Sequence, residues 1–344
     1  MNKKKKVLTH PAGIALGAMV SCALWGGAFP AIKIGYELYR IASDDIGGQI
    51  VFAGIRFVLA GILAWIIGSI LHRRPLWPKK SSWGRIVLLG LLQTFGQYFF
   101  FYIGLAHTTG VKAAIIEALN VFVAILVAAL IFREEKLSGK KILGCAIGFL
   151  GVVLLEVGSG IGNLSFSIAG EGCIFFSTVA YAFSSVLIRR FSQNERPFTL
   201  SAFQFIFGGL ELAAVGARIR ARQQVYRGNI DSIGGTAGRQ SILSTALSDP
   251  KALWILLLLA AISGVAYSLW GELLKYNEVS KVTVYGFMTP VFGVLFSALF
   301  LREAQGAGPA VIIVSLALVS FGTWMVQRNA KPGPGKKKER IKSS

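Results

Sequence analysis

The chain has 344 residues, of which 54% are hydrophobic and only 15% are charged, below the roughly 25% of charged residues in an ordinary soluble domain. Its formal net charge of +20 would suit nucleic-acid binding in a soluble protein. Here, however, the basic residues flank long apolar stretches, as they do in membrane proteins. We therefore expect an all-α integral membrane protein and no nucleic-acid partner.

The apolar stretches are long enough to cross a bilayer, because a spanning helix needs about 20 apolar residues. Ten of them follow one another along the chain, at residues 12–35, 46–71, 84–106, 111–132, 140–157, 168–190, 199–219, 251–275, 280–301 and 307–327. Three cysteines, Cys22, Cys145 and Cys173, lie within these stretches without a CxxC spacing. We interpret them as small apolar residues of the interior.

The distribution of Lys and Arg predicts that both termini are cytoplasmic. In that orientation most loop cations, such as those of HRRPLWPKK at residues 72–80, face the cytoplasm, as the positive-inside rule requires. Residues 217–250 are an exception, because this polar stretch contains five arginines but alternation puts it outside. We expect it to be a long polar loop.

An internal repeat divides the chain into two halves of five spans. A shift of 169 residues aligns Tyr98 with Tyr267, Lys112 with Lys281, and the dipeptide at 133–134 with that at 302–303. A shift of 148 residues aligns IRFVLAG at 55–61 with FQFIFGG at 203–209. Because five is odd, the second half must be inverted relative to the first, an architecture that recurs in secondary transporters.

The predicted organisation is therefore ten transmembrane helices in two inverted five-helix repeats. The first repeat covers residues 12–157, and the second covers 168–327 with the polar loop at 217–250. Residues 1–11 and 328–344 are expected to be basic cytoplasmic tails.

Four segments resemble the drug/metabolite transporter (DMT) superfamily, specifically its EamA-type members: ALWGGAFPAIKIG, AGIRF, ALNVFVAILVAALIFREE and LKYNEVSKVTVYGFMTPVFGVLFSALFLRE. The resemblance covers about residues 12–327. It implies ten helices in two inverted repeats, cytoplasmic termini and a central substrate cavity. The stretch 217–250 departs from the family pattern, in which this connection is usually short.

Charged residues within spans are costly and usually face a cavity or an ionic partner. Glu117 is the sharpest candidate, because Asn120 follows at i+3 on the same helical face, and together they could bind an amine or a proton. The alternative is an ion pair of Glu117 with Arg56 or Lys112. Lys33, Arg56 and Glu211 are expected to be structural or coupling charges.

Aromatic and amide side chains inside the spans suit an amphipathic solute, and aromatic rings can also bind an amine by cation–π contact. With Glu117 and Asn120, the predicted substrate-binding residues are Trp25, Gln97, Tyr98, Tyr102, Tyr181, Tyr267, Trp270 and Tyr285. For each ring, packing or an interfacial position is the alternative.

The pattern predicts a secondary transporter of small organic metabolites or amphipathic drugs, with export favoured over import. A flippase for a lipid or lipid-linked sugar is the alternative, and a non-transporting scaffold is a third. No nucleophile, metal or cofactor motif is visible, so we expect neither an enzyme nor a cofactor or metal site. The expected partners are a small-molecule substrate and the bilayer, and a homodimer is also considered.

Overall fold

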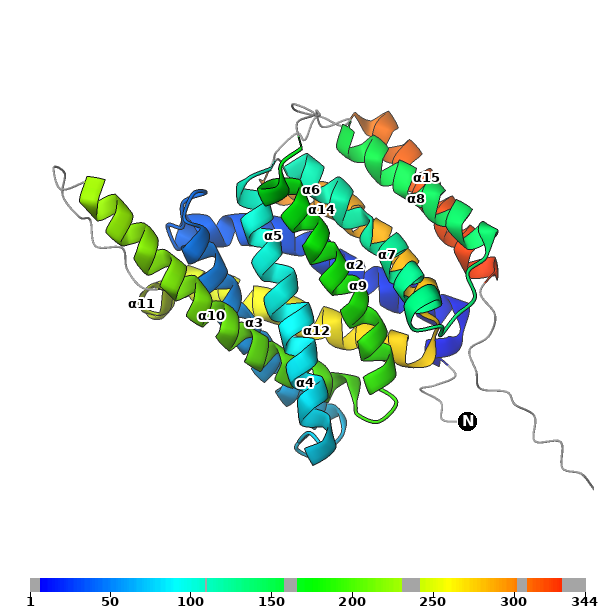
Figure 1. Cartoon of the computed structure of the whole chain (residues 1–344), viewed down its shortest axis with the longest axis horizontal. Helices are drawn as coiled ribbons and strands as arrows, with labels where there is room; N and C mark the ends of the chain where they lie inside the picture. The colour runs from blue at the N-terminus through cyan, green and yellow to red at the C-terminus, as the bar shows by residue number, and fades with distance from the viewer. Residues whose placement is uncertain (1–6, 109, 158–165, 231–241, 302–307, 330–344) are drawn as a thin grey trace, which may run out of the picture.

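The computed structural model describes residues 7–108, 110–157, 166–230, 242–301 and 308–329, and within these ranges every regular element is a helix. Figure 1 shows long helices packed side by side, with the helices at residues 139–157 and 309–329 together on one flank. Of the two expected basic tails, only residues 7–11 and 328–329 lie within the described part of the chain.

The first half contains five helical segments, three of them continuous and two built from consecutive pieces. They are α2 (Pro11–Leu38); α3 (Ile46–Leu71); η1 (Lys80–Ser82), α4 (Trp83–Leu89), η2 (Gly90–Gly96) and α5 (Gln97–Ala106); α6 (Gly110–Ala118), α7 (Asn120–Leu126) and η3 (Val127–Ile131); and α8 (Gly139–Val157).

The second half repeats this pattern, with one short additional helix, α11. Its elements are η4 (Ile168–Gly172) and α9 (Cys173–Phe191); α10 (Pro197–Ile230); α11 (Ile242–Ser248); α12 (Pro250–Tyr276); α13 (Val279–Thr283), η5 (Val284–Phe287) and α14 (Met288–Leu301); and α15 (Pro309–Asn329).

Within the described residues, nine helical segments are long and apolar enough to cross a membrane. The remaining predicted span, the fifth at 140–157, corresponds to α8, which has 19 residues and includes Lys140 and Lys141 in its first turn. The all-helical membrane fold predicted from the sequence is therefore confirmed.

The seventh span differs from the prediction, because α10 does not end near residue 219 but continues as helix to Ile230. The apolar stretch ends at the membrane boundary, but the Ala, Arg and Gln residues that follow it are good helix formers. The helix therefore continues beyond the apolar stretch. Arg220 on this extension pairs with Asp45 at 3.3 Å. Part of the stretch expected to be a loop is therefore helical, and residues 231–241 lie outside the described part.

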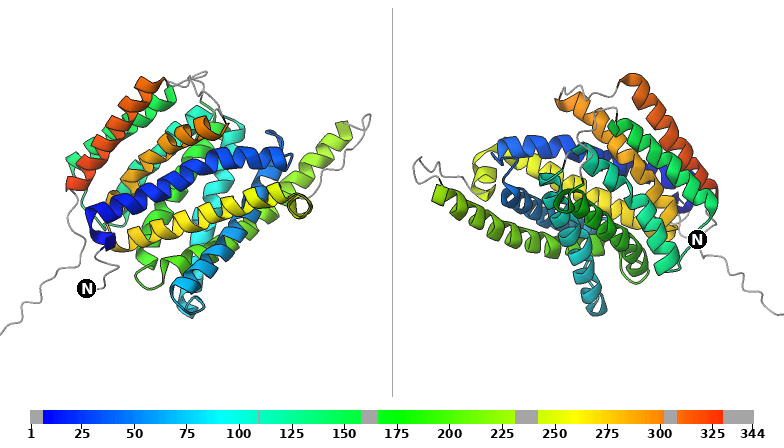
Figure 2. Two further views of the ribbon diagram at one scale, coloured as in Figure 1. Left: turned by 180° about the vertical axis from the view of Figure 1, so that it is seen from behind. Right: turned by 45° about the horizontal axis from the view of Figure 1, so that its top comes forward.

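The contacts between helices stay the same when each helix is replaced by its equivalent in the other half. Equivalent helices pack on each other, α3 on α10 and α8 on α15. Helix α2 contacts α12 and α14, and its equivalent α9 makes the matching contacts with α5 and α7. Figure 2 shows α2 beside α12 and α8 beside α15 from further directions. An approximate two-fold relation between the halves follows from this pairing.

One hydrogen bond locates the axis of this relation. The hydroxyl groups of Tyr98 and Tyr267, which the 169-residue shift makes equivalent, are 2.8 Å apart. A residue can touch its own equivalent only where the axis relating the two halves passes between them. The axis therefore passes through the centre of the bundle at this pair.

Glycines allow the equivalent helices to approach closely. A Cβ on Gly144 of α8 would lie 2.9 Å from the carbonyl oxygen of Gly322 in α15, and one on Gly209 of α10 would lie 2.8 Å from that of Gly54 in α3. Real Cβ atoms do not tolerate such distances, so these positions require glycine. Small residues serve this purpose in membrane helices generally.

Candidate functional site

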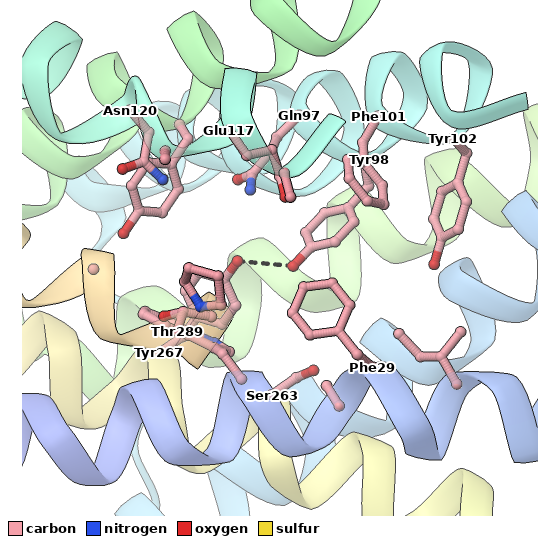
Figure 3. Close-up of a pocket in the computed structure, with 18 of the residues that line it drawn as sticks. Phe29, Gln97, Tyr98, Phe101, Tyr102, Glu117, Asn120, Ser263, Tyr267 and Thr289 are labelled. Carbon is pink, nitrogen blue, oxygen red and sulfur yellow. Dashed lines mark hydrogen bonds between the residues drawn. The ribbon is translucent and has the colours of Figure 1, made fainter. Parts of the chain in front are cut away.

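A cavity of about 170 Å³ lies in the middle of the bundle, at the Tyr98–Tyr267 pair. Its wall is formed by both halves, with residues from α2, α3, α5, α6, α7, α9, α12, η5 and α14. Figure 3 shows Gln97, Glu117 and Asn120 entering from one side and Phe29 and Ser263 from the opposite side.

Most of the predicted binding residues meet in this wall. Eight of the ten line it, namely Trp25, Gln97, Tyr98, Tyr102, Glu117, Asn120, Tyr181 and Tyr267. Of the three predicted structural or coupling charges, Arg56 also lines it. That they bind a solute stays a prediction, but residues that are up to 242 positions apart, from Trp25 to Tyr267, face one space.

The structure keeps the other predicted residues out of the wall. Trp270 is only 1% exposed and packs edge-on behind Trp25, with ring centroids 5.0 Å apart. Tyr285 lies beside Cys22, whose Sγ donates to the Tyr285 carbonyl oxygen at 3.1 Å. Lys33 is exposed, because it is one position and about 100° around the helix from the lining residue Ile32. Glu211 lies on α10, which contributes no residue to the cavity.

The two ion pairs considered for Glu117 do not form. Lys112 pairs instead with Glu171, at 3.0 Å between Nζ and Oε1. The Arg56 guanidinium lies over the rings of Phe57 and Tyr98, 4.6 and 5.7 Å from their centroids, and its buried Nε has no hydrogen-bond partner among the described residues. The cavity thus presents a carboxyl and a guanidinium group, neither of which is ion-paired within the described chain.

Further polar atoms in the wall lack partners. The indole Nε1 of Trp25 and the amide Oε1 of Gln97 are buried and make no hydrogen bond to any described residue. Buried polar atoms normally find a partner within the protein or in water. Two lining residues therefore carry a buried donor and a buried acceptor that have no partner among the described residues.

The sequence analysis missed four polar or aromatic residues of the wall, Phe29, Phe101, Ser263 and Thr289. Three of them lie one helical turn from a predicted residue: Phe29 follows Trp25, Phe101 follows Gln97 and Ser263 precedes Tyr267, each by four positions. Residues at this spacing share a helical face, so these three follow once the predicted residue on the same helix is known to face the cavity.

The cavity contains further pairs of equivalent positions. The 169-residue shift aligns Glu117 with Gly286 and Asn120 with Thr289, and all four line the wall. The site therefore straddles the two-fold axis but has different chemistry on its two sides, because the carboxyl group is opposite a glycine.

An ionic network joins the halves at one end of the bundle. Lys141 Nζ lies 3.0 Å from Glu135 Oε2 and 3.3 Å from Glu278 Oε2. The Ser280 hydroxyl donates to the same Glu135 oxygen at 2.6 Å. Since Glu135 and Lys141 belong to the first half and Glu278 and Ser280 to the second, this network holds the two halves together at that end.

The sequence profile of the EamA-like transporter family matches residues 12–157 and 168–326. A WAT1-related chloroplastic protein of Arabidopsis thaliana is 26% identical over 305 residues, which cover 86% of this chain and 67% of that protein. A protein of Salmonella typhimurium described as "Probable amino-acid metabolite efflux pump" is 26% identical over 91% of this chain and 96% of its own length.

A solved structure described as "Crystal structure of protein" matches with a TM-score of 0.66 at 17% identity. The match covers 93% of this chain and 98% of that one. At this identity the likeness extends to the fold alone.

Proposed function

This chain belongs to the EamA-like transporter family, a membrane transporter family, and we propose that it moves small organic metabolites or amphipathic drugs across the cytoplasmic membrane by alternating access around the central cavity. Its two five-helix repeats, 12–157 and 168–327, are the halves that exchange conformations. The ionic network of Glu135 must open when the cavity becomes accessible from that end.

One observation carries the proposal: Arg56 and Glu117 present opposite, unpaired charges to one aromatic cavity. A guanidinium group binds a carboxylate through two parallel hydrogen bonds, and a carboxylate surrounded by aromatic rings suits an ammonium group. A zwitterionic metabolite such as an amino acid satisfies both charges at once. The relatives described as amino-acid metabolite efflux pumps fit this class of substrate.

The size of the cavity favours a small solute over the alternative flippase function. Its volume of about 170 Å³ is close to that of an engineered protein cavity of about 150 Å³ that binds benzene. A lipid-linked sugar is much larger than this space. In this conformation the cavity therefore suits a metabolite or a small drug.

The cations of the loops support a cytoplasmic location for both termini and for the Glu135 end of the bundle. Export is then movement away from the end that this network closes. Cysteines introduced at Ser81 and at Ser43, which are exposed at connections on opposite ends of α3, test the orientation. An impermeant thiol reagent added outside intact cells should label only Ser43→Cys, and labelling of Ser81→Cys instead would reverse the topology.

Transport is tested with purified protein reconstituted in liposomes. A thermal-shift screen of amino acids, amines and nucleosides first selects ligands, because a bound ligand stabilises the fold by mass action. Flux of the selected ligands is then compared among wild type, Arg56→Gln, Glu117→Gln and the matched control Glu211→Gln, whose carboxyl group lies outside the cavity. Flux of a fluorescent lipid but of no small solute would favour the flippase.

A further inference from the structure

A second cleft, of about 370 Å³, lies where the connection between α3 and α4 meets the connection between α9 and α10. It is strongly basic, since Arg74, Lys79, Arg196 and Lys275 line it against one carboxylate among the described residues, that of Glu195. It is separate from the central cavity, with which it shares no residue.

Glu195 already serves a structural purpose in this cleft. Its Oε2 accepts hydrogen bonds from the Lys79 backbone N–H at 3.0 Å and from the Ser82 hydroxyl at 2.9 Å, and its Oε1 accepts from the Arg196 N–H at 3.1 Å. The carboxylate thereby ties the two connections together. Arg74 and Arg196 form no ion pair with any described residue, so the cleft keeps an excess of positive charge.

Exposed apolar residues precede and follow the cleft residue Arg74 in the sequence. Ile70 and Leu71 at the end of α3 are 70% and 64% exposed, and Trp77 in the connection is 67% exposed. In a membrane protein such residues contact lipid, and tryptophan prefers the level of the headgroups. The basic cleft therefore lies beside lipid-facing side chains at the end of a membrane-spanning helix.

We propose that this cleft binds the phosphate group of an anionic phospholipid, whose acyl chains lie along the apolar end of α3. Arginine recognises phosphate through paired hydrogen bonds, and basic pockets between membrane helices are suited to anionic headgroups. Arg74 and Arg196 are the principal ligands, with Lys79 and Lys275 adding charge. Because the lining comes from both halves, the lipid stabilises the arrangement in which these connections are together.

The test measures the melting temperature of detergent-purified protein with added short-chain phosphatidylglycerol, phosphatidylcholine or sodium phosphate. Phosphatidylglycerol should raise the melting temperature and phosphatidylcholine should not. In Arg74→Gln/Arg196→Gln the apparent affinity for phosphatidylglycerol should fall by about tenfold or more, since two charge-assisted hydrogen bonds are lost. The matched control Arg218→Gln/Arg222→Gln removes two exposed cations from the α10 extension and should respond as wild type does.

Three results would overturn the proposal. If the two double variants bind phosphatidylglycerol with equal affinity, the effect is general charge attraction and not a site. If sodium phosphate alone raises the melting temperature as much as phosphatidylglycerol does, the ligand is a soluble phosphate. Should the cleft variant fail to fold, native mass spectrometry of the wild type is the alternative test, in an equimolar mixture of phosphatidylglycerol and phosphatidylcholine. Equal retention of these two lipids would exclude a site for the anionic headgroup. None of these measurements depends on transport, so their outcome does not depend on which substrate the central cavity binds.

Discussion

The two halves of the molecule share one scaffold but contribute different chemistry to the central cavity. Both of its charged groups, Arg56 and Glu117, come from the first half. At the equivalent positions the second half has Gln204, which is fully buried and donates to Gln93 Oε1 at 2.6 Å, and Gly286, which has no side chain. The symmetry is thus kept in the packing of the helices, and it is broken in the charged groups that line the cavity.

Replacing the cavity carboxylate Glu117 should have the largest effect. Glu117→Gln keeps the shape of the side chain but removes a charge-assisted contact to an ammonium group, so flux should fall by roughly 10–100-fold. The pH dependence of flux should also flatten, because an amide cannot titrate. Flux against pH in liposomes measures both.

Melting curves of the same variants separate this role from a structural one. Breaking a buried ion pair between Glu117 and Arg56 would cost about 3–5 kcal/mol, and neutralising both residues would then restore stability. Since no such pair forms, we expect Glu117→Gln to melt near the wild-type temperature. Normal flux with a normal pH profile would remove Glu117 from the mechanism.

Moving the carboxylate across the axis tests the asymmetry directly. A Cβ on Gly286 would meet only Val121 and Asn120 side-chain atoms, at 3.6 and 3.8 Å, which is ordinary van der Waals contact, and Gly286 itself lines the cavity. Gly286→Glu in the Glu117→Gln background should restore the pH dependence of flux but not its full rate. Gly286→Gln in the same background is the control, and equal recovery in the two would show that the charge is irrelevant.

Arg56 should matter for the choice of substrate more than for transport itself. In Arg56→Gln the KM for a zwitterion should rise about tenfold or more, because one charge-assisted contact to its carboxylate is lost. The KM for the corresponding amine, which lacks the carboxylate, should change far less. Parallel rises for both solutes would instead assign Arg56 to packing against Phe57 and Tyr98.

The sequence predicted the spans and much of the cavity, because hydropathy and the 169-residue repeat are properties of the chain alone. It did not predict which face of a span turns inward. Tyr267 and Trp270 differ by only three positions, yet the first lines the cavity and the second is packed behind Trp25. That choice depends on how neighbouring helices cross, and the end of α10 at Ile230 depends on helix propensity beyond the bilayer, which hydropathy does not report.

The hydrogen bond on the axis should give the smallest effect and the cleanest test of symmetry. Tyr98→Phe and Tyr267→Phe each remove the same bond, worth about 1 kcal/mol, so the two variants should lose the same small amount of melting temperature. The double variant should lose no more than either single one, because contacting residues are not additive and no hydroxyl is then left without its partner. If the two single variants lose different amounts of melting temperature, the surroundings of Tyr98 and Tyr267 are not equivalent, and the halves differ at the axis as well as in their charged groups. Additive losses would mean that the two hydroxyls act separately, and the axis would then have to be located by other contacts.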